Sequence, residues 1–400
     1  MVSVTEQYDI YPYPARDPAD EGARLITGSP SHPLEMDHFL WGGTRDWSQR
    51  IDILVAGGGT GDGLIQMAQM LTSAGRPYTI TYIDLSVKAR EVAEARAARR
   101  GLSNITFHTG SLLEAPKLGR FDYVDCCGVL HHLPDPDAGF RALRAAMAPG
   151  GGAGIMVYAP YGRSGVYPLQ EAFGALFDGL SAPERLKRAK EIVVALPKGH
   201  PFRANTNLVD HEQSDAGFYD LLLHSQDRAY SVADLLATAR RTGWQLASFA
   251  TPGLYDLGQI TKAGAALDAE TRMGLAEKLR GTIKVHTAYL RPSEAELQPI
   301  PTGRNRSHIP HLRGLDPKAL AQAIARGKRP TLRTGGEAIP LAFAPETAPL
   351  IAAINGQRSL AEIAAQTRSD VFAFAALWQR IEDALSPWGV LLYSDLLKAR

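Results

Sequence analysis

A glycine-rich segment is the first place in this sequence where residue types and spacing could do chemistry. The apolar run Ile51 to Val55 leads directly into Gly57-Gly58-Gly59-Thr60-Gly61-Asp62-Gly63. Glycines let the backbone turn tightly and approach a ligand closely, so the segment predicts a nucleotide-type cofactor. The alternative is a strand-to-helix turn with no ligand. A dinucleotide fingerprint would need a glycine where this chain has Asp62, whereas Gly57-x-Gly59-x-Gly61 fits without adjustment.

Two later segments could complete such a site. Asp84 ends the next β-branched run, where a carboxylate can accept the hydrogens of both ribose hydroxyls. It could equally cap the following helix, a role that Ser86 could share. After the third run, the turn from Thr109 to Leu113 could place a hydroxyl or a backbone amide beside an adenine edge.

Histidine and cysteine pairs occur close together further along the chain. His131 is the candidate acid–base catalyst, with His132 second, because imidazole changes charge near neutral pH; a structural role is the alternative. Cys126 and Cys127 are the only cysteines and are adjacent, so neither a disulfide staple nor a metal cluster is expected. We predict no metal site and a reducing, cytoplasmic environment.

The elements that must position these residues follow an alternating pattern. Short β-branched runs and longer helical patterns alternate from residue 51, which predicts an α/β fold with a parallel sheet and crossover helices. The predicted strands are 51–55, 78–83, 105–108, 121–127, 153–158, 244–250 and 282–290. The predicted helices of this region are 62–74, 87–99, 137–147 and 231–242. The last strand needs no crossover helix and should be antiparallel, completing a seven-stranded sheet.

The same pattern divides the chain into four parts. Residues 1–50 form an arm, and residues 51–160 with 229–292 form the cofactor-binding core. Residues 161–228 interrupt the alternation for longer than an ordinary loop, which predicts a helical insertion acting as a lid. Beyond a Pro-containing stretch, residues 293–400 are predicted as a helical or winged-helix-like domain with a helix, helix, helix, strand order.

The order of these motifs resembles the class I (seven-stranded, Rossmann-like) S-adenosylmethionine-dependent methyltransferases. The resemblance covers about half of the chain and rests on residues 53–61, 82–86, 121–134 and 143–152. It implies S-adenosylmethionine as cofactor and S-adenosylhomocysteine as product. The cofactor-binding residues that it implies are Gly57, Gly58, Gly59, Gly61, Asp62, Asp84, Leu85, Gly110, Ser111, Leu112, Cys127 and Gly128. Residues 147–151 would form the turn before the fifth strand.

Two positions depart from the pattern of that family. Val55 stands where the family often has an acid two residues before the first glycine, and Ser111 stands at an adenine-contacting position that is often acidic. Cofactor contacts must therefore differ in part. Asp62 could supply a carboxylate near the ammonium group of the cofactor, but its place at the start of a helix favours an ordinary capping role.

The segments that flank the core are expected to choose the methyl acceptor, because ligands of open α/β sheets bind beyond the carboxyl ends of the strands. The candidate substrate residues are Tyr11, Tyr13, Trp41, Tyr158, Tyr161 and Arg163, with simple packing of the arm as the alternative for each. Lys plus Arg (43) nearly balances Asp plus Glu (42), so no nucleic-acid or membrane partner is expected.

These observations favour a methyltransferase with a small-molecule acceptor, ahead of a protein (lysine-type) methyltransferase. The C-terminal part resembles the regulatory domain of some bacterial methyltransferases, lysine methyltransferases included, and is expected to serve protein contact or dimerisation. Two rivals come from other classes. One is a non-catalytic module that senses S-adenosylmethionine, and the other is an NAD-dependent oxidoreductase, which the residue Asp62 disfavours.

Overall fold

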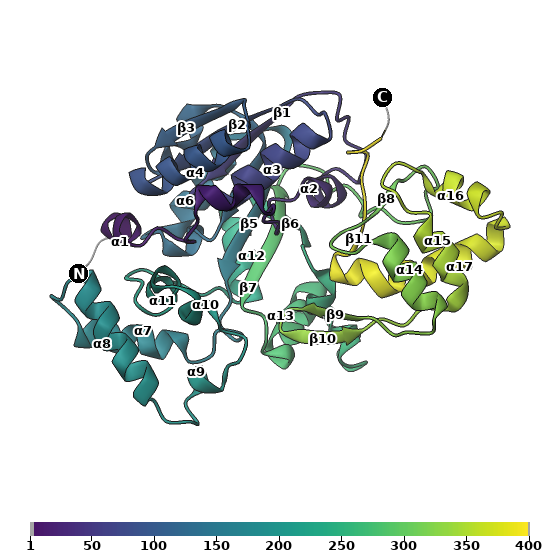
Figure 1. Cartoon of the computed structure of the whole chain (residues 1–400). Helices are drawn as coiled ribbons and strands as arrows, with labels where there is room; N and C mark the ends of the chain where they lie inside the picture. Colours follow the sequence, from purple (N-terminus) through teal and green to yellow (C-terminus); the bar gives the residue numbers. More distant parts are fainter. Residues whose placement is uncertain (1–3, 399–400) are drawn as a thin grey trace.

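The computed structural model describes residues 4–398, which are built around one seven-stranded sheet (Figure 1). The strand order is β3-β2-β1-β4-β5-β7-β6. The strands are β1 (Ile51–Ala56), β2 (Tyr78–Asp84), β3 (Ile105–Thr109), β4 (Phe121–Cys127), β5 (Met147–Tyr158), β6 (Trp244–Phe249) and β7 (Val285–Pro292). β7 pairs antiparallel with both β5 and β6, and the remaining pairs are parallel. The predicted α/β sheet with an antiparallel last strand is confirmed.

Helices cover both faces of this sheet because apolar residues of the strands point alternately to either side. On β1, Ile53 and Val55 join a core with α2 (Pro33–Leu40), α3 (Asp62–Ser73) and α4 (Val87–Arg99). Leu54 and Ala56 face the other core, with α5 (Ala115–Leu118), α6 (Pro136–Ala145) and α12 (Val232–Arg241). Strands buried on both faces are typical of a parallel sheet.

The boundaries of β5 and β7 differ from the predicted ones. β5 begins at Met147, which pairs with Phe121, and the register then shifts so that Gly152 pairs with Tyr123. The residues predicted as a turn therefore form an irregularity inside the strand. β7 begins at Val285 instead of Thr282. The backbone of Ile283 instead accepts a hydrogen bond from Gly162, at the entry to the insertion.

In Figure 1 the arm (purple) lies in front of α4, and the insertion (teal) lies below the sheet at the lower left. The arm contains α1 (Val4–Ile10) and the 3-10 helix η1 (Pro18–Gly22), and η1 contacts α4. The insertion contains α7 (Val166–Leu176), α8 (Ala182–Ala195), α9 (Pro201–Ala204), α10 (Asp210–Gln213) and α11 (Asp215–Leu222). Its apolar residues form a small core of their own. The insertion is helical, as the sequence predicts.

The C-terminal part contains more elements than the sequence indicates. The helices α15 (Ala348–Ala352), α16 (Leu360–Gln366) and α17 (Val371–Leu385) and the strand β11 (Leu391–Tyr393) follow the predicted order. They are preceded by β8 (Pro310–Leu312), α14 (Pro317–Ala325) and a hairpin of β9 (Thr331–Thr334) and β10 (Glu337–Pro340). β8 pairs with β11, a partnership between distant segments that local patterns cannot reveal. The winged-helix-like description stays a prediction.

The C-terminal part packs directly on the core. Its buried side chains, such as Ile351 and Trp378, belong to the same apolar cluster as the sheet residues Leu54 and Val124. α13 (Ala269–Arg280) lies between β6 and β7 in the chain, within the core. None of the helices within residues 4–398 is both long and apolar enough to cross a membrane.

Candidate functional site

A cavity of about 800 Å³ lies where the carboxyl ends of β1, β2 and β4 meet the arm and the insertion. Crossovers leave β1 and β4 toward opposite sides of the sheet, and ligands of open α/β sheets bind at such a switch point. From the core, the lining residues include Gly57, Gly58, Gly59, Asp62, Asp84, Leu85, Gly110, Ser111, Leu112, Asp125, Cys127, Gly128 and His132. The arm contributes Tyr13 and Arg16, and the insertion contributes Asp210 and Asp220.

The glycine loop has almost no room for side chains. Gly57 adopts a φ of +70°, and a Cβ on it would lie 2.5 Å from Val129 Cγ2. A Cβ on Gly58 would lie 2.3 Å from the ring of Tyr82. The loop can therefore pass between β4 and β2 only as glycine, which leaves its backbone facing the cavity.

Asp84 closes the end of β2 against this loop. Its Oδ2 accepts a hydrogen bond from the Gly59 amide at 2.8 Å, and its Oδ1 accepts one from the Ser86 amide at 2.9 Å. Burial raises the pKa of Asp84, and these backbone donors partly oppose the increase. Ser86, and not Asp84, caps α4 through the Ala89 amide. Each Asp84 oxygen retains acceptor capacity toward the cavity.

Every cofactor residue that the sequence indicates lines this cavity except Gly61. Gly61 is the N-cap of α3 with a φ of +97°, and a Cβ on it would lie 3.0 Å from Ala93 on α4. Its role in the structure is close packing between the loop and α4. Gly61 is therefore the predicted cofactor residue that lies outside the lining of the cavity.

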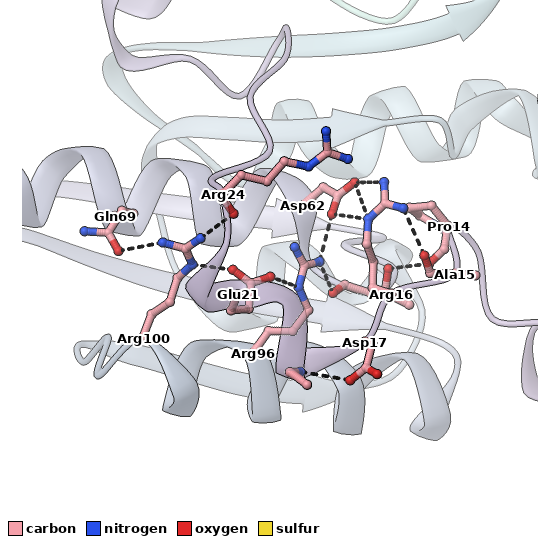
Figure 2. Close-up of polar contacts among 12 residues, drawn as sticks. Pro14, Ala15, Arg16, Asp17, Glu21, Arg24, Asp62, Gln69, Arg96 and Arg100 are labelled. Carbon is pink, nitrogen blue, oxygen red and sulfur yellow. Dashed lines mark hydrogen bonds and ion pairs between the residues drawn. The ribbon is translucent and has the colours of Figure 1, made fainter.

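Asp62 does not cap α3, so the expected capping role is wrong. No side chain caps this helix, because the Asp62 carboxylate instead faces Arg16 of the arm and Arg96 of α4. Figure 2 shows both guanidinium groups converging on it, with Glu21 bridging Arg96 to Arg100. The distances are 2.6 Å from Arg16 Nη2 to Oδ2 and 2.8 Å from Arg96 Nη1 to Oδ1. Asp62 therefore fastens the arm across the glycine loop.

Asp125 on β4 is a cavity residue that sequence reasoning missed. It is buried, and among the described residues Ser31 is its one side-chain partner, with Oγ at 2.9 and 3.0 Å from the two carboxylate oxygens. Burial raises the pKa of Asp125 to about 7, and the Ser31 bond lowers it only in part. The available signal was an acid in the middle of the apolar run 121–127, although the direction it faces depends on the register of the sheet.

The six predicted substrate residues separate into two groups. Tyr13, Tyr158 and Arg163 line the cavity, where the Arg163 guanidinium stacks 3.6 Å from the centre of the Tyr158 ring. Tyr158 Oη also donates to Asp220 Oδ2 at 2.9 Å. Tyr158 and Arg163 therefore lie together with Asp220, whereas the carbonyl oxygen of Tyr13 lies close to Gly59, 3.0 Å from where a Cβ on that glycine would be.

Tyr11, Trp41 and Tyr161 are outside the lining. Tyr11 stacks on Tyr219 of the insertion, with ring centres 5.2 Å apart. The Trp41 indole donates to the carbonyl of Gly150, near the amino end of β5, whereas the cavity lies at the carboxyl ends of the strands. Tyr161 is 37% exposed. These three aromatics pack or face solvent, which was the alternative that the sequence left open.

His131 does not line the cavity, whereas His132 does. Both belong to the 3-10 helix η3 (Leu130–His132) and are buried, and burial lowers the pKa of each. His132 Nδ1 lies 2.7 Å from the carbonyl oxygen of Gln226, so this nitrogen carries the proton and Nε2 has the free lone pair. The structure therefore places the second candidate, and not the first, at the site.

Comparisons with known proteins agree with this geometry. The family model "Methyltransferase domain" matches residues 54–153. An uncharacterized protein of Synechococcus is 34% identical over 239 residues, which are 58% of this chain and 56% of that protein. The ubiquinone biosynthesis O-methyltransferase of Albidiferax ferrireducens is 31% identical over 105 residues, 26% of this chain and 38% of the enzyme. The chain thus matches about half, or less, of the length of these relatives.

A solved structure shares nearly the whole fold. PKMT2 from Rickettsia typhi superposes with a TM-score of 0.66 at 15% identity, covering 93% of this chain and 77% of the other. The likeness concerns the fold, and the fold includes the C-terminal part. With the sheet order and the cavity at its switch point, the family match means that residues 54–153 belong to a class I S-adenosylmethionine-dependent methyltransferase domain.

Proposed function

We propose that this protein transfers the methyl group of S-adenosylmethionine to a small polar acceptor bound in the second half of the same cavity. One observation carries the proposal. A single cavity extends from the glycine loop and Asp84 to Arg163 and Asp220, and side chains of the arm and of the insertion cover that second end. A small molecule suits a cavity of about 800 Å³, because this volume is in the range of small-molecule sites.

The residues at the first end fit the cofactor. Asp84 supports hydrogen bonds from ribose hydroxyls, and Ser111 with Leu112 supports an adenine contact. Asp125 is the best candidate for the ammonium group, because it is a buried carboxylate with a single side-chain partner. It takes the role that Val55 cannot fill, since Asp62 is already bonded to two arginines. An approaching cation would stabilise the charged form of Asp125.

The residues at the second end would hold and orient the acceptor. When bound, S-adenosylmethionine supplies an electrophilic methyl group on a sulfonium. Cys127 and Gly128, at the end of β4, border the space between the two halves of the cavity. Arg163 and Asp220 offer opposite charges, and Lys284 adds a cation at the edge. Catalysis then depends on in-line placement of the acceptor and on the exclusion of water, with a base needed only where the acceptor must lose a proton.

Calorimetric titration with S-adenosylmethionine, S-adenosylhomocysteine and NAD tests the first half of the proposal. Binding of the first two and loss of binding in Asp84→Ala would support it, whereas binding of NAD alone would contradict it. A screen with a radiolabelled methyl donor tests the second half. Label in low-molecular-weight products supports a small acceptor, and label in protein lysine points to the rival enzyme. Cofactor binding with no acceptor labelled would favour a sensing module.

A further inference from the structure

We infer that His131, His132 and Asp227 form a binding site for a divalent transition-metal ion of the Zn²⁺ type, beside the acceptor end of the cavity. Each residue offers one donor atom, and these three atoms all lie within 4.8 Å of one another. Two imidazoles and a carboxylate form a donor set that first-row metals use in proteins. The inference concerns metal binding and does not depend on the acceptor proposed above.

The donor atoms of this group are unusually short of partners. His131 is 1% exposed, yet neither of its ring nitrogens has a hydrogen-bond partner within the described residues. The Asp227 side chain is also 1% exposed, and its Oδ1 has none either. A buried polar group without a partner is destabilising, because it has given up its hydrogen bonds to water and gained none in return. An ion bound between His131 and Asp227 would give both side chains the partner that they lack.

His132 is already oriented as metal-binding histidines are. Its Nδ1–H donates to the carbonyl of Gln226, which leaves the Nε2 lone pair as the remaining donor. Metal-ligating histidines generally give their second ring N–H to a carbonyl or carboxylate in this way. Asp227 is held similarly, because its Oδ2 accepts from Gln170 at 2.9 Å and from Arg163 at 3.2 Å. Other residues of the chain therefore already hold His132 and Asp227 in place through hydrogen bonds.

The net charge of this region favours a bound cation, and a second group of donor atoms nearby has to be distinguished from the first. Asp220, Asp227 and Arg163 contribute two negative charges and one positive charge to this buried region, and a divalent cation would offset the negative excess. His132, Asp220 and His224 also have donor atoms within 4.8 Å of one another. There, however, His224 Nδ1 accepts from the Gln226 amide, so its Nε2 carries the proton. We therefore assign the ion to the His131 group.

Zinc titration of the intact, chelator-treated protein tests the assignment, with Co²⁺ as an optical probe. We expect one Zn²⁺ per chain and a visible Co²⁺ absorption band. His131→Gln and Asp227→Asn should weaken Zn²⁺ binding by at least about tenfold, since even loss of an outer contact has that effect. His108→Gln on β3 is the control, because His108 belongs to neither group of donors, and it should bind like the native chain.

Other outcomes would overturn the assignment. One is the absence of stoichiometric Zn²⁺ binding, which would mean that a water molecule bridges the orphan atoms. Another is that His224→Gln abolishes binding while His131→Gln does not, which would place the ion in the neighbouring group. If a variant fails to fold, anomalous diffraction at the zinc edge of the native protein still decides, because it locates the ion beside either His131 or His224.

Discussion

Replacing Glu21 by Gln tests how strongly the arm is fastened over the cofactor end of the cavity. Each carboxylate oxygen of Glu21 accepts from one guanidinium, Arg96 on one side and Arg100 on the other (Figure 2). Glu21 is 8% exposed and Arg96 is 1% exposed, so these pairs are largely removed from solvent. The amide removes the negative charge but keeps nearly the same volume.

The expected loss in the free energy of unfolding depends on the hydrogen bonds that Arg96 and Arg100 retain in the variant. Breaking a buried ion pair costs about 3–5 kcal/mol because a charge is left without compensation. Arg96 would still bond Asp62 at 2.8 Å and the Thr60 carbonyl at 2.7 Å, and Arg100 would still bond the Arg24 carbonyl at 2.7 Å. We therefore expect a loss of about 2 kcal/mol, below the range for a fully orphaned charge.

Denaturant unfolding and limited proteolysis of the arm measure this loss. The net pKa of Glu21 is lowered, because the guanidinium bonds outweigh the burial that raises it. Its stabilisation is therefore present above its unfolded pKa and is lost as the pH falls through the lower folded pKa. The difference in stability between the native chain and the variant should therefore become smaller in acid.

Glu270→Gln is the matched control, because its ion pair with Arg240 is about half exposed and should contribute at most about 1 kcal/mol. Equal stability and equal cleavage of the arm in the two variants would refute the reasoning.

Three further predictions concern the cavity. Asp84→Ala should weaken S-adenosylmethionine binding roughly 10- to 100-fold by loss of charged hydrogen bonds, and unchanged calorimetric affinity would contradict the role of Asp84. Gly58→Ala should destabilise the protein by about 1–3 kcal/mol through its clash with Tyr82, whereas Gly174→Ala, with open space around it on α7, should be neutral or stabilising in thermal unfolding. Because the folded pKa of Asp125 is raised to about 7, its stabilising contribution is complete below the unfolded pKa and is lost as the pH rises through 7. Asp125→Asn should therefore gain stability relative to the native chain at pH 8 but not at pH 4, and an equal effect at both would show that the carboxylate is not desolvated.

Local patterns predicted most of the residues that line the cofactor end of the site. The turn of Gly57 and Gly58 and the place of Asp84 depend on neighbours in sequence and on strand ends, which hydrophobic periodicity predicts. β4 and α4 begin and end at the predicted residues. These elements are long and strongly patterned, so their boundaries were well determined.

The proposed acceptor end depended on contacts that no local pattern encodes. His132 contacts Gln226 across 94 residues, and Tyr158 contacts Asp220 across 62. His131 and His132 are adjacent in η3 and point in different directions, so the orientation of this short helix decides which of them lines the cavity. The sequence predicted no metal site because its only cysteines are adjacent. The metal site proposed above depends on Asp227, which is far from the histidines in the chain and which only the fold brings close to them.

The sequence by itself determined the α/β class, the seven strands and the cofactor loop. The class and the strands follow from hydrophobic periodicity, and the loop follows from glycine conformations that the backbone requires there. Only the tertiary structure decided that Asp62 binds the arm, that Asp125 lines the cavity and that Trp41 lies near the amino end of β5. Each of these depends on strand register and on which segment covers which end of the sheet. Such choices are set by packing over the whole chain, because a shift of one residue in register moves a side chain to the other face of the sheet.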